Sequence, residues 1–228
     1  MSNLAGMFGR TLVVAPHPDD EVLGAGGTIA RLSGEGQEVF VAVVTEGKPP
    51  AYSQDSVARV QAEARTAHRV LGVKETFWLG QPAAALAETA HSALNHAVYT
   101  LIDRVAPQTL LLPFIGDMHI DHQLTFMSSL VAARPHQANF PKLILAYETL
   151  SETNWNAPYL TPAFTPNMFV DISDHLGAKL EAMRSFGSQL REAPHERSLA
   201  TLKALATLRG ATIMRNAAEA FVLVRQVV

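Results

Sequence analysis

Short apolar runs alternate with segments of helical pattern along most of this chain, and this alternation limits the fold more than any other feature. The runs carry few charges, and the run at residues 39–45 is rich in β-branched residues, which is typical of strands buried on both faces of a sheet. Strands that alternate with helices form parallel sheets covered by helices on both faces. The sequence therefore predicts an α/β protein built around a mostly parallel sheet.

The expected elements follow from the period of the apolar positions and from Gly, Pro and Ser at the ends of each segment. Strands are expected at residues 11–15, 39–45, 75–79, 109–112, 143–147 and 168–172, with a closing edge strand at 220–228. Helices are expected at residues 22–33, 53–71, 89–105, 121–133, 173–190 and 195–209. This order indicates a three-layer, Rossmann-like fold.

Length and composition fit a single folding unit. The chain has 228 residues, of which 48% are hydrophobic and 17% charged, so it can bury a sizeable core. Residues 151–166 are rich in Asn, Pro and Thr and are expected to form a long surface loop. No segment looks like a linker or an internal repeat, so residues 1–228 are expected to form one domain.

Charge, cysteine content and hydropathy exclude several classes of protein. A net charge of −3 gives no basic field, so a nucleic-acid partner is not expected. The chain has no cysteine, which excludes disulfides and thiolate metal ligands and suits a reducing compartment. Residues 1–10 lack the pattern of a signal peptide, and no apolar run approaches the ~20 residues that span a bilayer. We therefore expect a cytoplasmic protein without a membrane span.

Two polar clusters follow two of the expected strands. Residues 16–21 read Pro-His-Pro-Asp-Asp-Glu after the first strand, and residues 117–122 read Asp-Met-His-Ile-Asp-His after strand 109–112. Ligands of open α/β sheets bind beyond the carboxyl ends of the strands, so both clusters are expected at one crevice. Together they offer His17, Asp19, Asp20, His119, Asp121 and His122.

Imidazole and carboxylate groups suit Zn²⁺ or Fe²⁺. A catalytic zinc site needs three protein ligands and an open position, at which the metal activates water and polarises a carbonyl. A carboxylate that is not a ligand can then accept the proton of the water, and another group can stabilise the oxyanion. The six side chains suffice for these roles, but their spacing does not assign them.

The opening cluster, followed by Gly26-Gly27-Thr28 and later by His119-Ile-Asp-His122, resembles the LmbE-like, or PIG-L, family of zinc-dependent N-acetylglucosaminide deacetylases. The likeness extends to residues 59–72, 165–173, 209–210 and 218–221. It implies a single LmbE-like domain that removes an acetyl group from an N-acetylated sugar or glycoside. It also implies a homo-oligomer, a trimer or a hexamer.

The resemblance also implies roles for the six side chains. It implies metal ligands at His17, Asp20 and His122, with zinc as the metal and Fe²⁺ or another divalent ion as an alternative. It implies that Asp19 is the general base and that His119 stabilises the oxyanion and protonates the leaving amine. Asp121 would orient and charge His119.

Other residues are expected to contact the substrate or to lie at the surface. In the family an arginine near position 59 often faces the sugar, so Arg59 is a candidate for substrate binding. Asn167 and Glu46 are further candidates because they lie next to expected strands. Phe186 stands where relatives often have a tyrosine. The remaining histidines are expected at the surface or in loops: His68, His91, His96, His136, His175 and His195.

Two alternatives remain open at this point. One is another metal-dependent enzyme on the same scaffold, such as a hydratase or an amidase of a non-sugar substrate. The other is a catalytically silent sugar-binding module. Three glycines at positions 24, 26 and 27 would allow helix 22–33 to pack closely on the sheet, to lie close to the site, or both.

Overall fold

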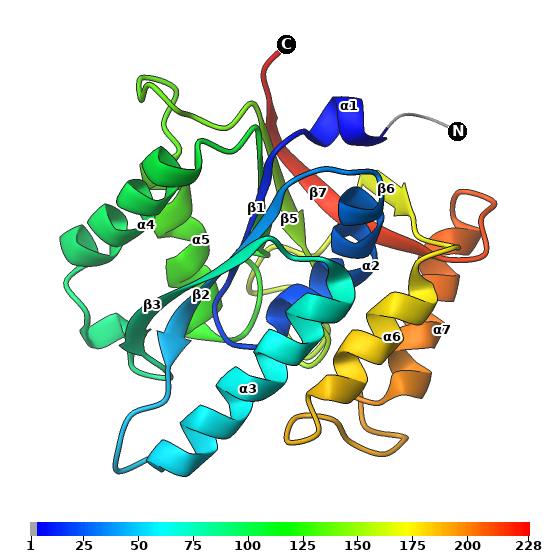
Figure 1. Cartoon of the computed structure of the whole chain (residues 1–228), viewed down its shortest axis with the longest axis horizontal. Helices are drawn as coiled ribbons and strands as arrows, with labels where there is room; N and C mark the ends of the chain where they lie inside the picture. The colour runs from blue at the N-terminus through cyan, green and yellow to red at the C-terminus, as the bar shows by residue number, and fades with distance from the viewer. Residues whose placement is uncertain (1–3) are drawn as a thin grey trace.

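Seven strands form one sheet in the computed structural model, which describes residues 4–228 (Figure 1). The order across the sheet is β3-β2-β1-β4-β5-β7-β6. The parallel strands are β1 (Thr11–Ala15), β2 (Val39–Glu46), β3 (Glu75–Pro82), β4 (Thr109–Pro113) and β5 (Leu143–Tyr147). The last two, β6 (Met168–Asp171) and β7 (Ala218–Gln226), add antiparallel at one side. Residues 1–3, part of the stretch expected to lack a signal peptide, lie outside the described residues.

Helices cover both faces of the sheet, as the alternating pattern predicted (Figure 1). One face carries α2 (Asp20–Gly34), α3 (Gln54–Leu71), α6 (Leu176–Ser185) and α7 (Leu199–Ala211), with the short α1 (Leu4–Phe8) beside α2. The other face carries α4 (His91–Val105), α5 (Ile120–Ala132) and the 3₁₀ turn η1 (Leu86–Glu88). The three-layer α/β architecture is therefore confirmed.

Alternation along the buried strands divides the core in two. In β1, Val13 packs in the core below α2, whereas Leu12 and Val14 pack in the core below α4 and α5. Successive side chains of a strand point to opposite faces, so a strand buried on both faces must be apolar throughout. The continuous apolar runs of the sequence have this physical cause.

Local signals set the ends and the packing of the helices. Ser53 caps α3 by accepting a hydrogen bond from the backbone N–H of Ser56 at 3.2 Å, and Gly72 ends the helix with φ 74°. In α2, a Cβ added at Gly24 would lie 2.1 Å from Cδ2 of Tyr147. Gly24 therefore serves the close packing of this helix on β5.

The last third of the chain differs from the expectation in two respects. The strand expected as an edge at 220–228 is β7, which lies between β5 and β6, so β6 is the edge strand on that side of the sheet. The first four residues of β7 are buried, which suits an internal position. The helix expected at 173–190 is shorter, because the fully buried Phe186 leaves the helical conformation with ψ 58°. Helix α7 begins only after its cap, Ser198, whose Oγ accepts from Thr201 N.

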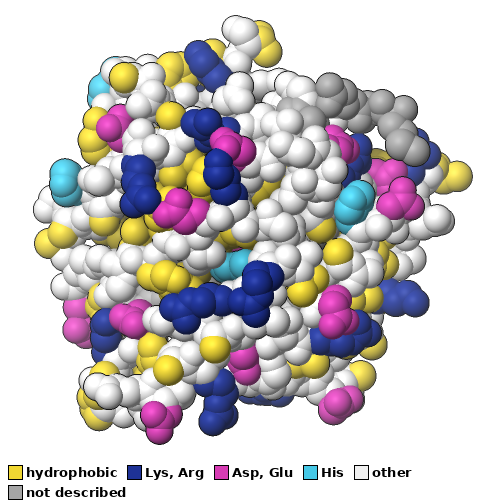
Figure 2. Space-filling model, viewed as in Figure 1, with side chains coloured by type: hydrophobic (Ala, Val, Ile, Leu, Met, Phe, Trp, Pro, Cys, Tyr) yellow, Lys and Arg dark blue, Asp and Glu magenta, His cyan; other side chains and the backbone are white. Residues whose placement is uncertain are grey.

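The surface carries charges of both signs. Figure 2 shows Lys and Arg side chains interspersed with Asp and Glu over the face seen there. Among the helices of residues 4–228, none is long and apolar enough to cross a lipid bilayer.

Candidate active site

The two polar clusters meet at the point where the strand order of the sheet reverses. From β1 the chain continues to β2 on one side of it, while β4 pairs with β1 on the other side. Crevices at such a switch point are the usual ligand sites of open α/β sheets. The loops after β1 and β4 leave the same edge and bring their side chains together.

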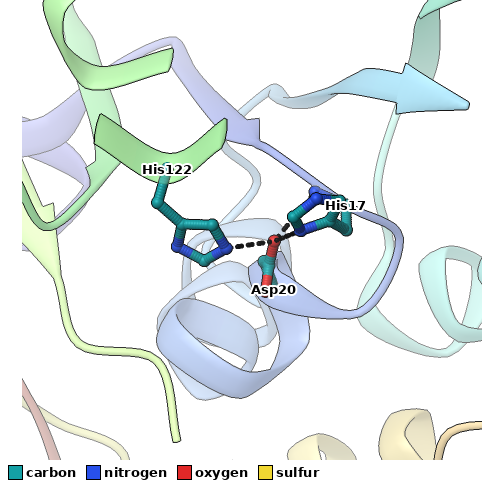
Figure 3. Close-up of side chains that lie close together, drawn as sticks. All are labelled: His17, Asp20 and His122. Atoms are coloured by element: carbon teal, nitrogen blue, oxygen red, sulfur yellow. Dashed lines mark hydrogen bonds and ion pairs between the residues drawn. The ribbon is translucent and has the colours of Figure 1, made fainter. Parts of the chain in front are cut away.

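His17, Asp20 and His122 form a compact group (Figure 3). His17 follows β1, Asp20 begins α2, and His122 stands in the first turn of α5. Asp20 Oδ2 lies 3.3 Å from His17 Nδ1 and 3.2 Å from His122 Nε2. Potential ligand atoms of the three residues all lie within 4.8 Å of one another.

Two atoms of this group lack the partners that buried polar atoms normally have. His122 Nε2 and Asp20 Oδ1 are buried, and neither has a hydrogen-bond partner within residues 4–228. An unsatisfied buried polar atom is unfavourable and often marks the place of a ligand or an ion. Two imidazoles and one carboxylate are a common donor set for divalent transition metals. The three residues therefore fit a divalent metal ion.

Each of the two imidazole rings also hydrogen-bonds a carboxylate through its other nitrogen. Asp117 Oδ2 accepts a hydrogen bond from His122 Nδ1 at 2.8 Å, and Asp121 Oδ2 accepts one from His17 Nε2 at 3.1 Å. These bonds leave His122 Nε2 and His17 Nδ1 for the metal, an arrangement common around protein metal sites. Burial lowers the pKa of each imidazole, but the surrounding carboxylates outweigh it and raise the pKa of His17 to about 9 and that of His122 to about 10.

Asp19 lies beside the three-residue group with an unusual backbone. Its φ is 115°, a left-handed conformation that non-glycine residues rarely adopt, and its backbone N–H donates to Glu21 Oε2 at 3.2 Å. Its side chain is 2% exposed, and Oδ2 accepts from Arg197 Nη1 at 3.1 Å. Burial, with Asp20 and Glu21 nearby, raises the pKa of Asp19 to about 8, and the charge of Arg197 opposes this shift.

His119 is oriented by the backbone of α5. It is the N-cap of that helix, and its Nδ1 accepts from the backbone N–H of Asp121 at 3.1 Å. The proton of a neutral ring is then on Nε2, which becomes a hydrogen-bond donor. Burial and the nearby His17 lower the pKa of His119. The carboxylate of Asp121 hydrogen-bonds His17 rather than His119, so Asp121 acts on His119 through its backbone N–H and its charge.

A cavity of about 340 Å³ opens above these groups. Its reactive end contains His17, Asp19, His119, Glu152 and Arg197. The lining also includes Glu46, Tyr52, Arg59, Trp78, Ser188 and Gln189. Arg59 and Glu46, two of the candidates for substrate binding, thus lie at this cavity, and their contact with a substrate stays a prediction.

Asn167 does not line this cavity. It lies just before β6, and its Oδ1 accepts from the backbone N–H of Leu223 in β7 at 2.8 Å. Its side chain therefore holds two neighbouring strands together.

The expectation that His68 lies at the surface is wrong. His68 is 3% exposed, its Nε2 lies 2.9 Å from Glu21 Oε1, and its Nδ1 lies 2.7 Å from Thr76 Oγ1. Helical spacing alone did not show that this position faces α2. By contrast, His91, His96 and His136 are exposed, as expected.

Sequence reasoning also missed Arg197 and Glu63. The carboxylate of Glu63 accepts from the backbone N–H and the hydroxyl of Ser188 at 3.0 and 2.5 Å, which places Ser188 and Gln189 at the cavity. Arg197 reaches Asp19 across 178 positions of sequence. The sequence pattern indicates neither contact, because each joins two residues more than 100 positions apart.

Comparisons with known proteins agree with this geometry. Residues 12–133 match the PIG-L family, described as GlcNAc-PI de-N-acetylase. A diacetylchitobiose deacetylase of Thermococcus kodakarensis is 30% identical over 195 residues, which cover 80% of this chain and 71% of that protein.

Solved structures show the same fold. The conserved protein TT1542 of Thermus thermophilus has a TM-score of 0.78 and 26% identity, with 96% of each chain covered. GalB of Pseudomonas putida, a 4-carboxy-2-hydroxymuconate hydratase, has a TM-score of 0.77 at 20% identity, with 96% of this chain and 98% of that chain covered. A likeness at that identity concerns the fold alone.

Proposed function

This chain belongs to the PIG-L family of GlcNAc-PI de-N-acetylases, and on that premise we propose that it hydrolyses the acetamide group of an N-acetylated sugar of the N-acetylglucosamine type. The observation that carries the proposal is a buried carboxylate, Asp19, beside a group of His17, Asp20 and His122 at one cavity. This pairing is what metal-assisted amide hydrolysis requires.

His17, Asp20 and His122 would hold the metal, and we propose zinc, with Fe²⁺ as the alternative. The nitrogen and oxygen donors of these residues suit either ion. When bound, such an ion polarises the acetyl carbonyl and lowers the pKa of water.

Asp19 is the general base of the proposed reaction. Its carboxylate accepts a proton from the attacking water, which adds to the acetyl carbonyl carbon. His119 donates a hydrogen bond from Nε2 to the oxyanion that develops on the carbonyl oxygen. The C–N bond then breaks, the amine takes up the proton that Asp19 accepted from the water, and acetate and a free amino sugar leave.

Substrate recognition is assigned to the other lining residues of the cavity. Arg59 and Glu46 can bind sugar hydroxyl groups, and Trp78, which also lines the cavity, offers an aromatic ring. A cavity of about 340 Å³ lies at the small end of the range typical of ligand sites. Asn167 has no part in this assignment, because its side chain holds β7.

Two observations favour this proposal over the hydratase and the silent sugar-binding module. The hydratase shares the fold at 20% identity, whereas the deacetylase relative matches at 30%. A silent sugar-binding module would not need a strained, buried carboxylate beside a metal group. The cytoplasmic location, the single domain over residues 1–228 and the homo-oligomer, a trimer or a hexamer, stay predictions.

Acetate and amine release from a panel of N-acetylated sugars tests the proposal, with zinc supplied and a chelator as control. Asp19→Ala is expected to lower turnover by at least about 100-fold, because a general base contributes about 10²–10⁴. Its metal content should equal that of the wild type. The control is Asp174→Ala, which changes an exposed carboxylate outside the cavity.

Near-normal activity of Asp19→Ala would contradict the assignment of the base. Sugar binding without acetate release by the wild type would favour the silent module. Turnover that persists in the presence of the chelator would contradict the proposed metal dependence.

A further inference from the structure

A guanidinium group from the last third of the chain reaches the carboxylate of Asp19. Arg197 Nη1 donates to Asp19 Oδ2 at 3.1 Å, and both residues line the cavity. Arg197 lies in the loop between α6 and α7, far in sequence from the loop that carries Asp19. This contact therefore joins two parts of the chain directly at the proposed base.

The loop after β5 fixes the orientation of the Arg197 side chain. Nε of Arg197 donates to Ser151 Oγ at 3.0 Å, and Nη2 lies 3.5 Å from Glu152 Oε1. The adjacent Glu196 accepts from the backbone N–H of Ser151 at 2.9 Å, so both Glu196 and Arg197 connect the two loops. A planar guanidinium held along two of its edges presents its remaining donor in a defined direction.

The two carboxylate oxygens of Asp19 differ in their hydrogen bonding. Oδ2 is occupied by Arg197, whereas no hydrogen bond within residues 4–228 occupies Oδ1. A base needs one oxygen held and the other available to accept a proton. A carboxylate without that restraint could rotate about χ2, and a displacement of about 1 Å can cost about 100-fold in rate.

We infer that Arg197 is a positioning residue, which orients Asp19 so that Oδ1 accepts the proton of the attacking water. This inference rests on the proposed function. It extends the site beyond the two sequence motifs, because the base in the loop after β1 depends on a residue between α6 and α7. A merely structural ion pair would stabilise the fold and leave the chemical step unchanged.

The same loop offers a matched control. Arg191 donates from Nη1 to the backbone oxygens of Ser188 and Leu190, each at 2.8 Å, and it is exposed. It does not line the cavity. Arg191→Ala therefore removes a guanidinium from this loop without touching Asp19.

The test compares Arg197→Ala, Arg197→Lys and Arg191→Ala with the wild type, on an N-acetylated sugar from which the wild type releases acetate. For Arg197→Ala we expect kcat to fall about 100-fold and KM to change less than about threefold, because a misplaced base affects the chemical step. Lysine should restore only part of the rate, because a point charge cannot hold Ser151 and Asp19 together. Added guanidinium ion should partly rescue Arg197→Ala and not Asp19→Ala.

Metal content and thermal stability are measured for each variant, so that a lost metal or an unfolded protein is recognised. Wild-type kcat in Arg197→Ala would overturn the inference, and so would an equal loss in Arg191→Ala. A loss of rate explained by lost metal or unfolding, with no guanidinium rescue, would also overturn it. A wild type that releases no acetate would instead contradict the proposed function itself, and with it this inference.

Discussion

The carboxylate of Asp117 sets the direction in which His122 can bind a metal. Asp117 is fully buried, Oδ2 accepts from His122 Nδ1 at 2.8 Å, and Oδ1 accepts from Thr153 Oγ1 at 2.6 Å. With the proton of the neutral ring on Nδ1, the lone pair is on Nε2, beside Asp20. The tautomer of His122 therefore depends on a residue that is not itself a ligand.

Asp117→Asn keeps the shape of the side chain and removes its charge. The amide can still accept from His122 with its oxygen and donate to Thr153, but the charge-assisted hydrogen bond is lost. Hydrogen bonds to charged groups contribute about 1.5–3 kcal/mol. Loss of such a partner behind a metal ligand lowers metal affinity about 10- to 100-fold, which equals about 1.4–2.7 kcal/mol. The two estimates agree.

The assay is a competition titration of the metal-free protein against a chromophoric chelator, with zinc as the metal. Asp103→Asn is the control, because Asp103 is an exposed carboxylate that accepts a hydrogen bond from Asn139 at 3.0 Å. Its affinity should equal that of the wild type. An Asp117→Asn affinity within about threefold of the wild type would refute the reasoning, because the expected loss starts at about 10-fold.

Two further predictions concern stability. Zinc at 100 times its dissociation constant should stabilise the metal-free protein by about 2.7 kcal/mol. When the zinc concentration is then kept fixed and thermal unfolding is measured at several pH values, this gain should shrink as pH falls, because protons compete at His17 and His122, whose pKa values are about 9 and about 10. A gain that grows towards low pH would contradict this. Gly24→Ala should cost about 1–3 kcal/mol in urea unfolding, since its Cβ would lie 2.1 Å from Tyr147. Gly177→Ala in α6 meets nothing within 4 Å and should stabilise by about 0.5–1 kcal/mol, so equal effects would refute the packing argument.

The sequence predicted the centre of the fold better than its periphery. Strands β1 and β5 have the expected bounds, because a strand buried on both faces must be a continuous apolar run. The predicted end of α6 at residue 190 was wrong, because the helix ends at Ser185, where burial of Phe186 overrides the helical pattern of the sequence. The position of β7 within the sheet was also missed, since a strand pattern does not show its neighbours.

The same distinction holds at the candidate site. His17 and Asp20 are three positions apart, and His122 follows a neighbouring strand, so the topology alone brings them together. Arg197 and His68 carried no such signal. The first lies in an irregular loop, and the second was one histidine among several on helical segments. Their contacts follow from tertiary packing, which spacing does not encode.

The strained backbone at Asp19 explains why these distant residues matter. A left-handed conformation at a non-glycine residue costs about 1–3 kcal/mol, and it persists only when the surroundings hold it. The carboxylate of Glu21 accepts a hydrogen bond from the backbone N–H of Asp19. His68, which belongs to α3, lies with its Nε2 2.9 Å from the other carboxylate oxygen of Glu21. Arg197 holds the side chain from the opposite end of the sequence. The proposed base is therefore fixed through its backbone by one region and through its carboxylate by another, so the motif residues alone do not make the site.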